Sequence, residues 1–243
     1  MSKALAMLFL GASLSLGSAL SSRAASPDAL RTAWQTSADI KQWDPLVRSV
    51  GSQIPANMGG RSACGSIGGG SLTAFYCTID RSIYITERTI DHIWSHYGSA
   101  GVAVVVAHEF AHARLHAIQG FTREAIWTSV IDELQADCTA GVYLRKSRDE
   151  PLDEAMVSKA AGLLENLGDY VPLERDWHGS PEMRRIAFLR GYREGSLSTC
   201  AASSDVNFRQ MRQETTEAIR QQIQIPDSQF NQLMQWGRQF LKP

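Results

Sequence analysis

The stretch Val104-Val105-Val106-Ala107-His108-Glu109-Phe110-Ala111-His112 decides the fold class of this chain. His108 and His112 are four residues apart, a spacing that places two imidazoles on one face of a helix. Both rings can then reach one metal ion, and Glu109 becomes a candidate general base beside it. The preceding residues 101–107 are apolar, so the helix is expected to be buried. Two polar rings on a buried helix favour a zinc site over a pair of core histidines satisfied by hydrogen bonds.

A zinc site needs a third protein ligand, and a glutamate on the next helix is the best candidate. The longer pattern with a further Gly and His is excluded because Leu115 and Ile118 stand at those positions. His116 lies about 12 Å along the helix axis from His108, at 1.5 Å per residue, which is too far for a shared ion. His116 is therefore interpreted as a helix-surface or second-layer residue, and Glu133 remains as the ligand.

Glu133 and Asp137 are four residues apart on a helical stripe that is otherwise apolar. Two carboxylates on such a stripe are costly unless positive charge meets them. We expect Glu133 to bind the metal and Asp137 to accept the free N–H of a ligating imidazole. The alternative is an ion pair of these carboxylates with Arg184 or Arg185.

Composition and the N-terminus indicate an exported globular protein. The 243 residues are 44% hydrophobic and 20% charged, with a net charge of −1, so nucleic acid and anionic membranes are not expected partners. Residues 1–24 have the pattern of a signal peptide: Lys3, an apolar and small-residue run, and a cleavage site at Ser22-Arg23-Ala24, or after Ser21. Glycines and serines make the run weak as an uncleaved anchor. The expected location is periplasmic or secreted, with no membrane span after signal removal.

Four cysteines in an exported chain suggest two disulfides. Cys64 and Cys77 flank a glycine-rich turn and are expected to pair with each other, which leaves Cys138 to pair with Cys200. A zinc site made of cysteines is not expected because no C-x-x-C spacing occurs.

The residue patterns predict an α+β fold that is mostly helical, with a small β-hairpin formed by residues 74–79 and 82–86. Residues 25–60 are expected to be an extended or partly helical lead-in, with Trp34 and Trp43 packed on the domain. Helices are predicted over residues 87–97, from Ser99 to Gly120, from Thr122 to about Lys146, from Asp153 to Leu167, from Pro181 to about Arg193, and in the tail after Asp205.

His178 stands just before one predicted helix, which Ser180 caps and Pro181 begins. His178 and Arg184 could therefore reach the zinc site from this helix start. A hydrolytic zinc site needs polar donors that stabilise the oxyanion of a tetrahedral intermediate. A structural role for His178 is an equal alternative.

With these residues in place, the chain resembles the putative neutral zinc metallopeptidase family of bacteria, within the wider gluzincin group. The string from Glu133 to Val142 is a far more specific match than the histidine pair. The chain departs from the family pattern at Phe110-Ala111 and at Ala113, none of which is a ligand, so these changes bear on substrate preference. In order, the matching pieces are Cys64-Gly65, Phe75-Tyr76-Cys77, Ile83-Tyr84-Ile85, Ala107-His108-Glu109 with His112, Glu133-Leu134-Gln135-Ala136-Asp137-Cys138-Thr139-Ala140-Gly141-Val142, and His178-Gly179-Ser180 with Arg184.

The resemblance implies a small sheet packed on a zincin-like helical core, Zn²⁺ held by His108, His112 and Glu133, and Glu109 as base. The expected activity is an exported zinc metalloendopeptidase acting on peptides or proteins, with strand 82–86 aligning the substrate by edge pairing. Alternatives are a zinc hydrolase of cell-wall peptides and a non-catalytic zinc-binding module, although the latter would be expected to lack Glu109. The sequence does not indicate an oligomeric state. We assign residues 1–24 to the signal peptide, 25–60 to the lead-in, 61–200 to the zinc metallopeptidase domain and 201–243 to a C-terminal helical extension.

Overall fold

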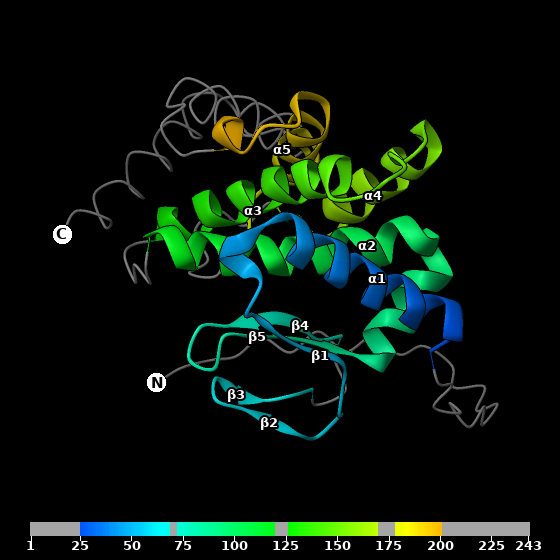
Figure 1. The fold of residues 1–243 in the computed structure, drawn as a ribbon, viewed down its shortest axis with the longest axis vertical. Helices are drawn as coiled ribbons and strands as arrows, with labels where there is room; N and C mark the ends of the chain where they lie inside the picture. The colour runs from blue at the N-terminus through cyan, green and yellow to red at the C-terminus, as the bar shows by residue number, and fades with distance from the viewer. Residues whose placement is uncertain (1–24, 69–71, 120–125, 170–177, 201–243) are drawn as a thin grey trace, which may run out of the picture.

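The computed structural model describes residues 25–68, 72–119, 126–169 and 178–200 (Figure 1). The signal peptide, the helix boundaries expected at Gly120 and Thr122, and the C-terminal extension lie outside these residues. No helix in the described part combines the length and apolar character needed to cross a membrane. The elements are α1 (Pro27–Trp43), η1 (Pro45–Val47), β1 (Gly51–Ala56), β2 (Arg61–Ser62), β3 (Gly65–Ser66), β4 (Ala74–Cys77), β5 (Ser82–Thr86), α2 (Glu87–Gln119), α3 (Ile126–Lys146), α4 (Glu154–Asn166), α5 (Pro181–Glu194) and η2 (Leu197–Cys200).

Helix α2 is the centre of the molecule, and the fold is the mostly helical α+β type that was predicted. The three-stranded sheet lies on one side of α2 and helices α3, α4 and α5 lie on the other, with α1 alongside (Figure 1). The apolar run 101–107 is buried throughout, as expected from its composition. Gly98 interrupts α2 with a φ of 64°, a backbone conformation that favours glycine, at the boundary predicted between two helices.

The sheet has the order β1-β5-β4, so its central strand is β5. β4 and β5 form the predicted antiparallel hairpin, and β1 pairs parallel with the other edge of β5. The expectation that residues 82–86 offer a free edge to a substrate is therefore wrong, because both edges of β5 are occupied. The edge strands of this sheet are β1 and β4. Residues 61–66, for which no strand was predicted, contain the short antiparallel ribbon β2–β3.

The N-terminal segment is built into the same core as α2. Helix α1 is a full helix of 17 residues, and its apolar face packs in one cluster with α2. The indole N–H of Trp34 donates to the carbonyl of Ile54 at 2.6 Å. Trp43 packs edge-on against Tyr143 of α3, with ring centroids 5.8 Å apart. Both tryptophans thus contact the rest of the protein, as expected.

Asp44, directly after α1, connects the N-terminal segment to both long helices. Its side chain is buried, and Oδ2 accepts hydrogen bonds from Arg114 Nη1 on α2 at 2.6 Å and from the Tyr143 hydroxyl on α3 at 2.7 Å. Oδ1 accepts the backbone N–H of Leu46 at 3.0 Å. A buried carboxylate is tolerated when it is paired and hydrogen-bonded in this way. We call these three side chains, Asp44, Arg114 and Tyr143, the Asp44 clamp.

The two disulfides are the predicted ones. Cys64–Cys77 joins the β2–β3 ribbon to β4, and Cys138–Cys200 joins α3 to the end of η2. Among the described residues no cysteine is free.

Candidate metal centre

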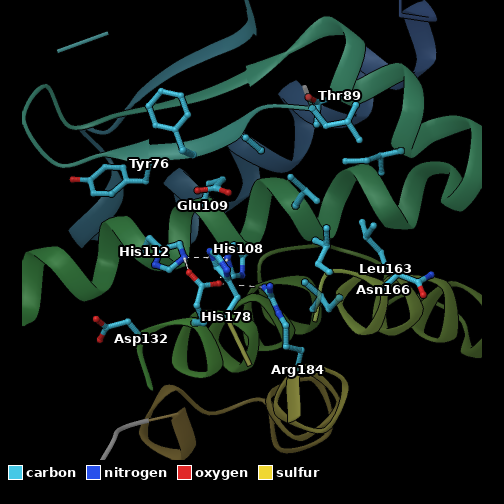
Figure 2. Close-up of a pocket in the computed structure, with 18 of the residues that line it drawn as sticks. Tyr76, Thr89, His108, Glu109, His112, Asp132, Leu163, Asn166, His178 and Arg184 are labelled. Atoms are coloured by element: carbon cyan, nitrogen blue, oxygen red, sulfur yellow. Dashed lines mark hydrogen bonds and ion pairs between the residues drawn. The ribbon is translucent and has the colours of Figure 1, made fainter. Parts of the chain in front are cut away.

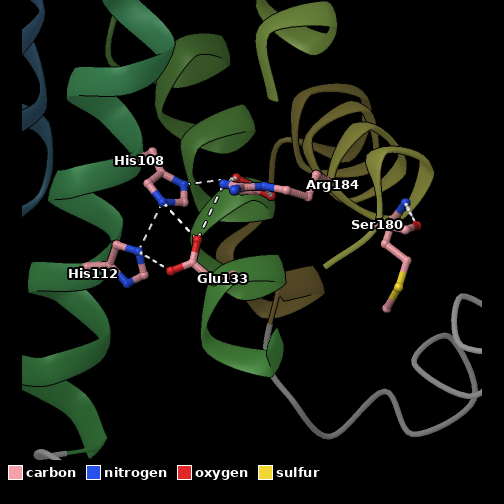
Figure 3. A network of polar contacts seen from close by, with 7 residues as sticks. His108, His112, Glu133, Ser180 and Arg184 are labelled. Carbon is pink, nitrogen blue, oxygen red and sulfur yellow. Dashed lines mark hydrogen bonds and ion pairs between the residues drawn. The ribbon is translucent and has the colours of Figure 1, made fainter. Parts of the chain in front are cut away.

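Three side chains from α2 and α3 converge on one point (Figure 3). The Nε2 atoms of His108 and His112 are 3.0 Å apart. Glu133 places Oε2 3.3 Å from Nε2 of His108 and Oε1 3.2 Å from Nε2 of His112. The three groups offer ligand atoms that all lie within 4.8 Å of one another, so they could hold a metal ion. His116, excluded on axial distance, is not a member of this group.

Asp137 and Arg184 form a second layer behind these groups. Asp137 is fully buried and its Oδ1 lies 2.8 Å from Nδ1 of His108. This contact orients the ring so that Nε2 faces Glu133 and His112. Arg184 donates two hydrogen bonds to Asp137, from Nε to Oδ2 at 2.9 Å and from Nη2 to Oδ1 at 3.0 Å. Its Nη2 also lies 3.3 Å from Oε2 of Glu133. Asp137 therefore contacts both the His108 imidazole and the Arg184 guanidinium, which the sequence had offered as alternative partners.

The charges around His108 favour a cation at this point. Burial lowers the pKa of the His108 imidazole, but hydrogen bonds and charges from Asp137 and Glu133 outweigh it and raise the pKa to about 10. Burial acts to raise the pKa of Glu133, yet His112 and His108 hold that pKa well below its usual range. Two imidazole nitrogens and one carboxylate are a common donor set for zinc in enzymes. The residues present fit such an ion.

Glu109 points away from the three converging side chains, toward β4 (Figure 2). Its carboxyl group is buried, which raises its pKa, while the charges of His108 and His112 and a hydrogen bond from the backbone of Tyr76 act in the opposite direction. A carboxylate with a raised pKa is a better proton acceptor than a carboxylate with the ordinary pKa. Its position beside the donor set, outside it, is the one expected of a general base.

A cavity of about 670 Å³ opens onto the metal centre. His178 is exposed and lines this cavity, as does the buried Arg184, so both residues expected at the site border it. Two further lining residues were not assigned from the sequence. Tyr76 on β4 binds Nδ1 of His116 through its hydroxyl at 2.9 Å, and Asp132 adjoins the candidate ligand Glu133. The Phe75-Tyr76-Cys77 match to the family was the available signal for Tyr76.

Helix α5 brings Arg184 to Asp137 because α5 and α3 approach closely. Gly191 leaves no room for a side chain, since a Cβ there would lie 1.8 Å from the carbonyl oxygen of Cys138. The start of α5 is fixed as predicted: the Ser180 side chain accepts the backbone N–H of Met183 at 3.2 Å, and a proline occupies the first turn.

Comparison with known proteins identifies the family. The model of the putative neutral zinc metallopeptidase family matches residues 54–203. This chain belongs to that family. The resemblance noted in the sequence is therefore confirmed, and the described residues of the candidate metal centre and both disulfides fall inside the family match. Asp44 lies before it.

The curated relatives of this family member are themselves uncharacterized. One, from Mycobacterium tuberculosis H37Rv, is 27% identical over 186 residues, covering 64% of this chain and 61% of the relative. Another, YpfJ of Escherichia coli K12, is 28% identical over 165 residues, covering 58% of this chain and 57% of YpfJ. The chain thus spans about three-fifths of the length of the curated relatives it matches. No solved structure matches it significantly.

Proposed function

We propose that this protein is an exported zinc metalloendopeptidase that hydrolyses peptide bonds. The observation that carries the proposal is the placement of Glu109 beside the His108, His112 and Glu133 donor set, on one cavity that β4 also borders. When held by these three residues, zinc supplies a Lewis acid that polarises a carbonyl group and makes water a stronger acid. Family membership supports the same activity.

Glu109 carries out the proton transfers. Its carboxylate accepts a proton from the attacking water and returns it to the nitrogen of the leaving amine. Asp137 holds the His108 ring in its ligating orientation, and Arg184 holds Asp137. His178, in the cavity wall, donates a hydrogen bond to the oxyanion that develops on the substrate carbonyl.

The edge of β4 aligns the substrate. Backbone groups on a free strand edge can bind an extended peptide by adding it to the sheet. β4 is the edge strand next to the metal centre, and its residues Ala74, Phe75 and Tyr76 line the cavity. This strand takes the role that the sequence had suggested for residues 82–86.

Export is supported by the signal-like N-terminus and by the two disulfides, since disulfides persist in oxidising compartments.

The test compares two glutamine variants with the wild type, measuring metal content by atomic spectroscopy and cleavage of an unfolded protein. Glu109→Gln is nearly isosteric and removes the proton acceptor, so zinc should stay near one per chain while cleavage falls steeply. Glu133→Gln removes an anionic ligand, so zinc and cleavage should fall together. Glu165→Gln, a surface carboxylate paired with Arg185 at 3.5 Å, is the matched control and should behave as wild type. Full cleavage by Glu109→Gln would defeat the mechanism, and a zinc-loaded wild type that cleaves nothing would defeat the function.

A further inference from the structure

Glu87, the first residue of α2, is a half-buried carboxylate that lacks a cationic partner in the described part of the chain. Its Oε1 accepts the backbone N–H of Ala25 at 3.1 Å, across 62 residues of sequence. Among the residues that the structure describes, no Lys, Arg or His forms an ion pair with Glu87. A neutral N–H donor leaves a partly buried carboxylate short of positive charge.

The contact between Ala25 and Glu87 is held in place by packed elements on both sides. Ala25 is 6% exposed and belongs to the core cluster that α1 and α2 share. Ser26, the next residue, caps α1, because its Oγ accepts the backbone N–H of Ala29 at 3.1 Å. Glu87 directly follows β5, whose last residue, Thr86, is fully buried. The backbone nitrogen of Ala25 is thus fixed beside the start of α2 (Figure 1).

The sequence offers two sites for removal of the predicted signal peptide, one after Ala24 and one after Ser21. Hydrolysis of the Ala24–Ala25 bond adds one water, leaving a carboxylate on Ala24 and an amine on Ala25. At neutral pH the amine takes up a proton and becomes an ammonium group. The nitrogen that lies 3.1 Å from Glu87 then carries the positive charge that this carboxylate lacks. Cleavage after Ser21 would leave the same nitrogen as a neutral amide.

We infer that a signal peptidase cleaves the exported chain between Ala24 and Ala25, and that the new ammonium group of Ala25 pairs with Glu87. The inference rests on the export that is part of the proposed function, and it names the processing site. Because Ala25 is buried in the folded protein, the cut precedes the packing of α1 on α2. A charge-assisted hydrogen bond, about twice as strong as a neutral one, then ties the mature N-terminus to the helix that carries His108 and His112.

The first measurement identifies the N-terminus of the exported protein. The full chain with a C-terminal affinity tag is expressed in a bacterium, recovered from the periplasm or the medium, and analysed by intact mass and N-terminal sequencing. We expect Ala25 as the first residue. A mature chain that starts at Ser22, or at any other residue after the signal peptide, would overturn the inference and leave export standing. A chain that keeps residues 1–24 would overturn both.

The second measurement compares two purified, zinc-loaded chains that start at Ala25 or at Ala24, each released from a fusion by a protease that leaves no extra residue. The chain that starts at Ala25 should melt about 2–4 °C higher, because a charged hydrogen bond replaces a neutral one in a protein of this size. Glu87→Gln keeps an acceptor but removes the charge, so this advantage should disappear, since an unpaired ammonium group is unfavourable at the N-terminus of α1. Asp91→Asn removes another carboxylate one turn farther along α2 and is the matched control, which should keep the difference.

The melting comparison separates this inference from the proposed function, because it requires neither export nor peptidase activity. A more stable Ala25 start whose advantage disappears in Glu87→Gln supports the pair even if the protein cleaves no peptide, a result that would defeat only the peptidase. Equal melting temperatures of the two starts, or a difference that persists in Glu87→Gln, would overturn the inference even if the protein is exported and active.

Discussion

Removing the Cys138–Cys200 disulfide should weaken both the fold and the metal centre. The bridge closes a loop with a sequence separation of 62, against 13 for Cys64–Cys77. In the chain-entropy model, the lost constraint on the unfolded chain lowers the free energy of unfolding by about 4 kcal/mol for the longer loop and by about 3 kcal/mol for the shorter one. The two bridges should thus differ by only about 1 kcal/mol in stability.

Their effects on zinc should differ much more. Cys138 directly follows Asp137, whose carboxylate contacts the His108 ring. Cys200 ends η2, the element that follows α5, and α5 carries Arg184, the partner of Asp137. Loss of this bridge should loosen α5 against α3, where Asp137 and Arg184 lie behind the candidate ligands. The Cys64–Cys77 bridge joins the β2–β3 ribbon to β4, and neither carries a candidate ligand.

The assay uses paired alanine variants of each bridge. Urea unfolding of the metal-free proteins gives the stability difference, and competition with a chromogenic chelator at a temperature where both variants stay folded gives zinc affinity. We expect both variants to lose stability but only Cys138→Ala/Cys200→Ala to release zinc more readily. Equal zinc affinity in the two variants would show that the bridge has no specific influence on the metal centre.

Two further substitutions test single side chains. His178→Ala should keep zinc and fold but lower turnover by roughly 10²–10³, the usual cost of one oxyanion donor; unchanged steady-state kinetics would assign His178 a structural role. Asp44→Ala leaves the partly buried Arg114 guanidinium and the buried Tyr143 hydroxyl without their shared acceptor and should cost about 3–5 kcal/mol in urea unfolding. Asp39→Ala, which removes a more exposed carboxylate of α1, should cost far less, and similar losses in the two variants would refute the importance of the clamp.

Local patterns predicted the candidate site well because helix geometry fixes which residues share a face. The four-residue spacings in His108–His112 and Glu133–Asp137 determine orientation without knowledge of the fold. The Ser180 cap is equally local, and it predicted where α5 begins. The roles of these residues in binding and catalysis remain predictions for the experiments above.

Contacts between distant segments could not be predicted in the same way. The position of β5 in the sheet depends on β1, which pairs with it across about 30 residues and has a weak strand pattern interrupted by Pro55. The Tyr76–His116 contact likewise joins a strand to a helix, and neither partner alone signals the other. Tertiary packing, which single-segment patterns do not encode, decides both.

The Asp44 clamp sets a practical limit on the smallest folding unit. A recombinant fragment trimmed to the family match would begin at residue 54 and lose α1 together with Asp44. Arg114 is two residues beyond His112, so the cation left without its carboxylate would sit one half-turn from a candidate zinc ligand. Expression boundaries for biochemical work should therefore be drawn ahead of residue 25, where the described structure starts, rather than at the edge of detectable similarity.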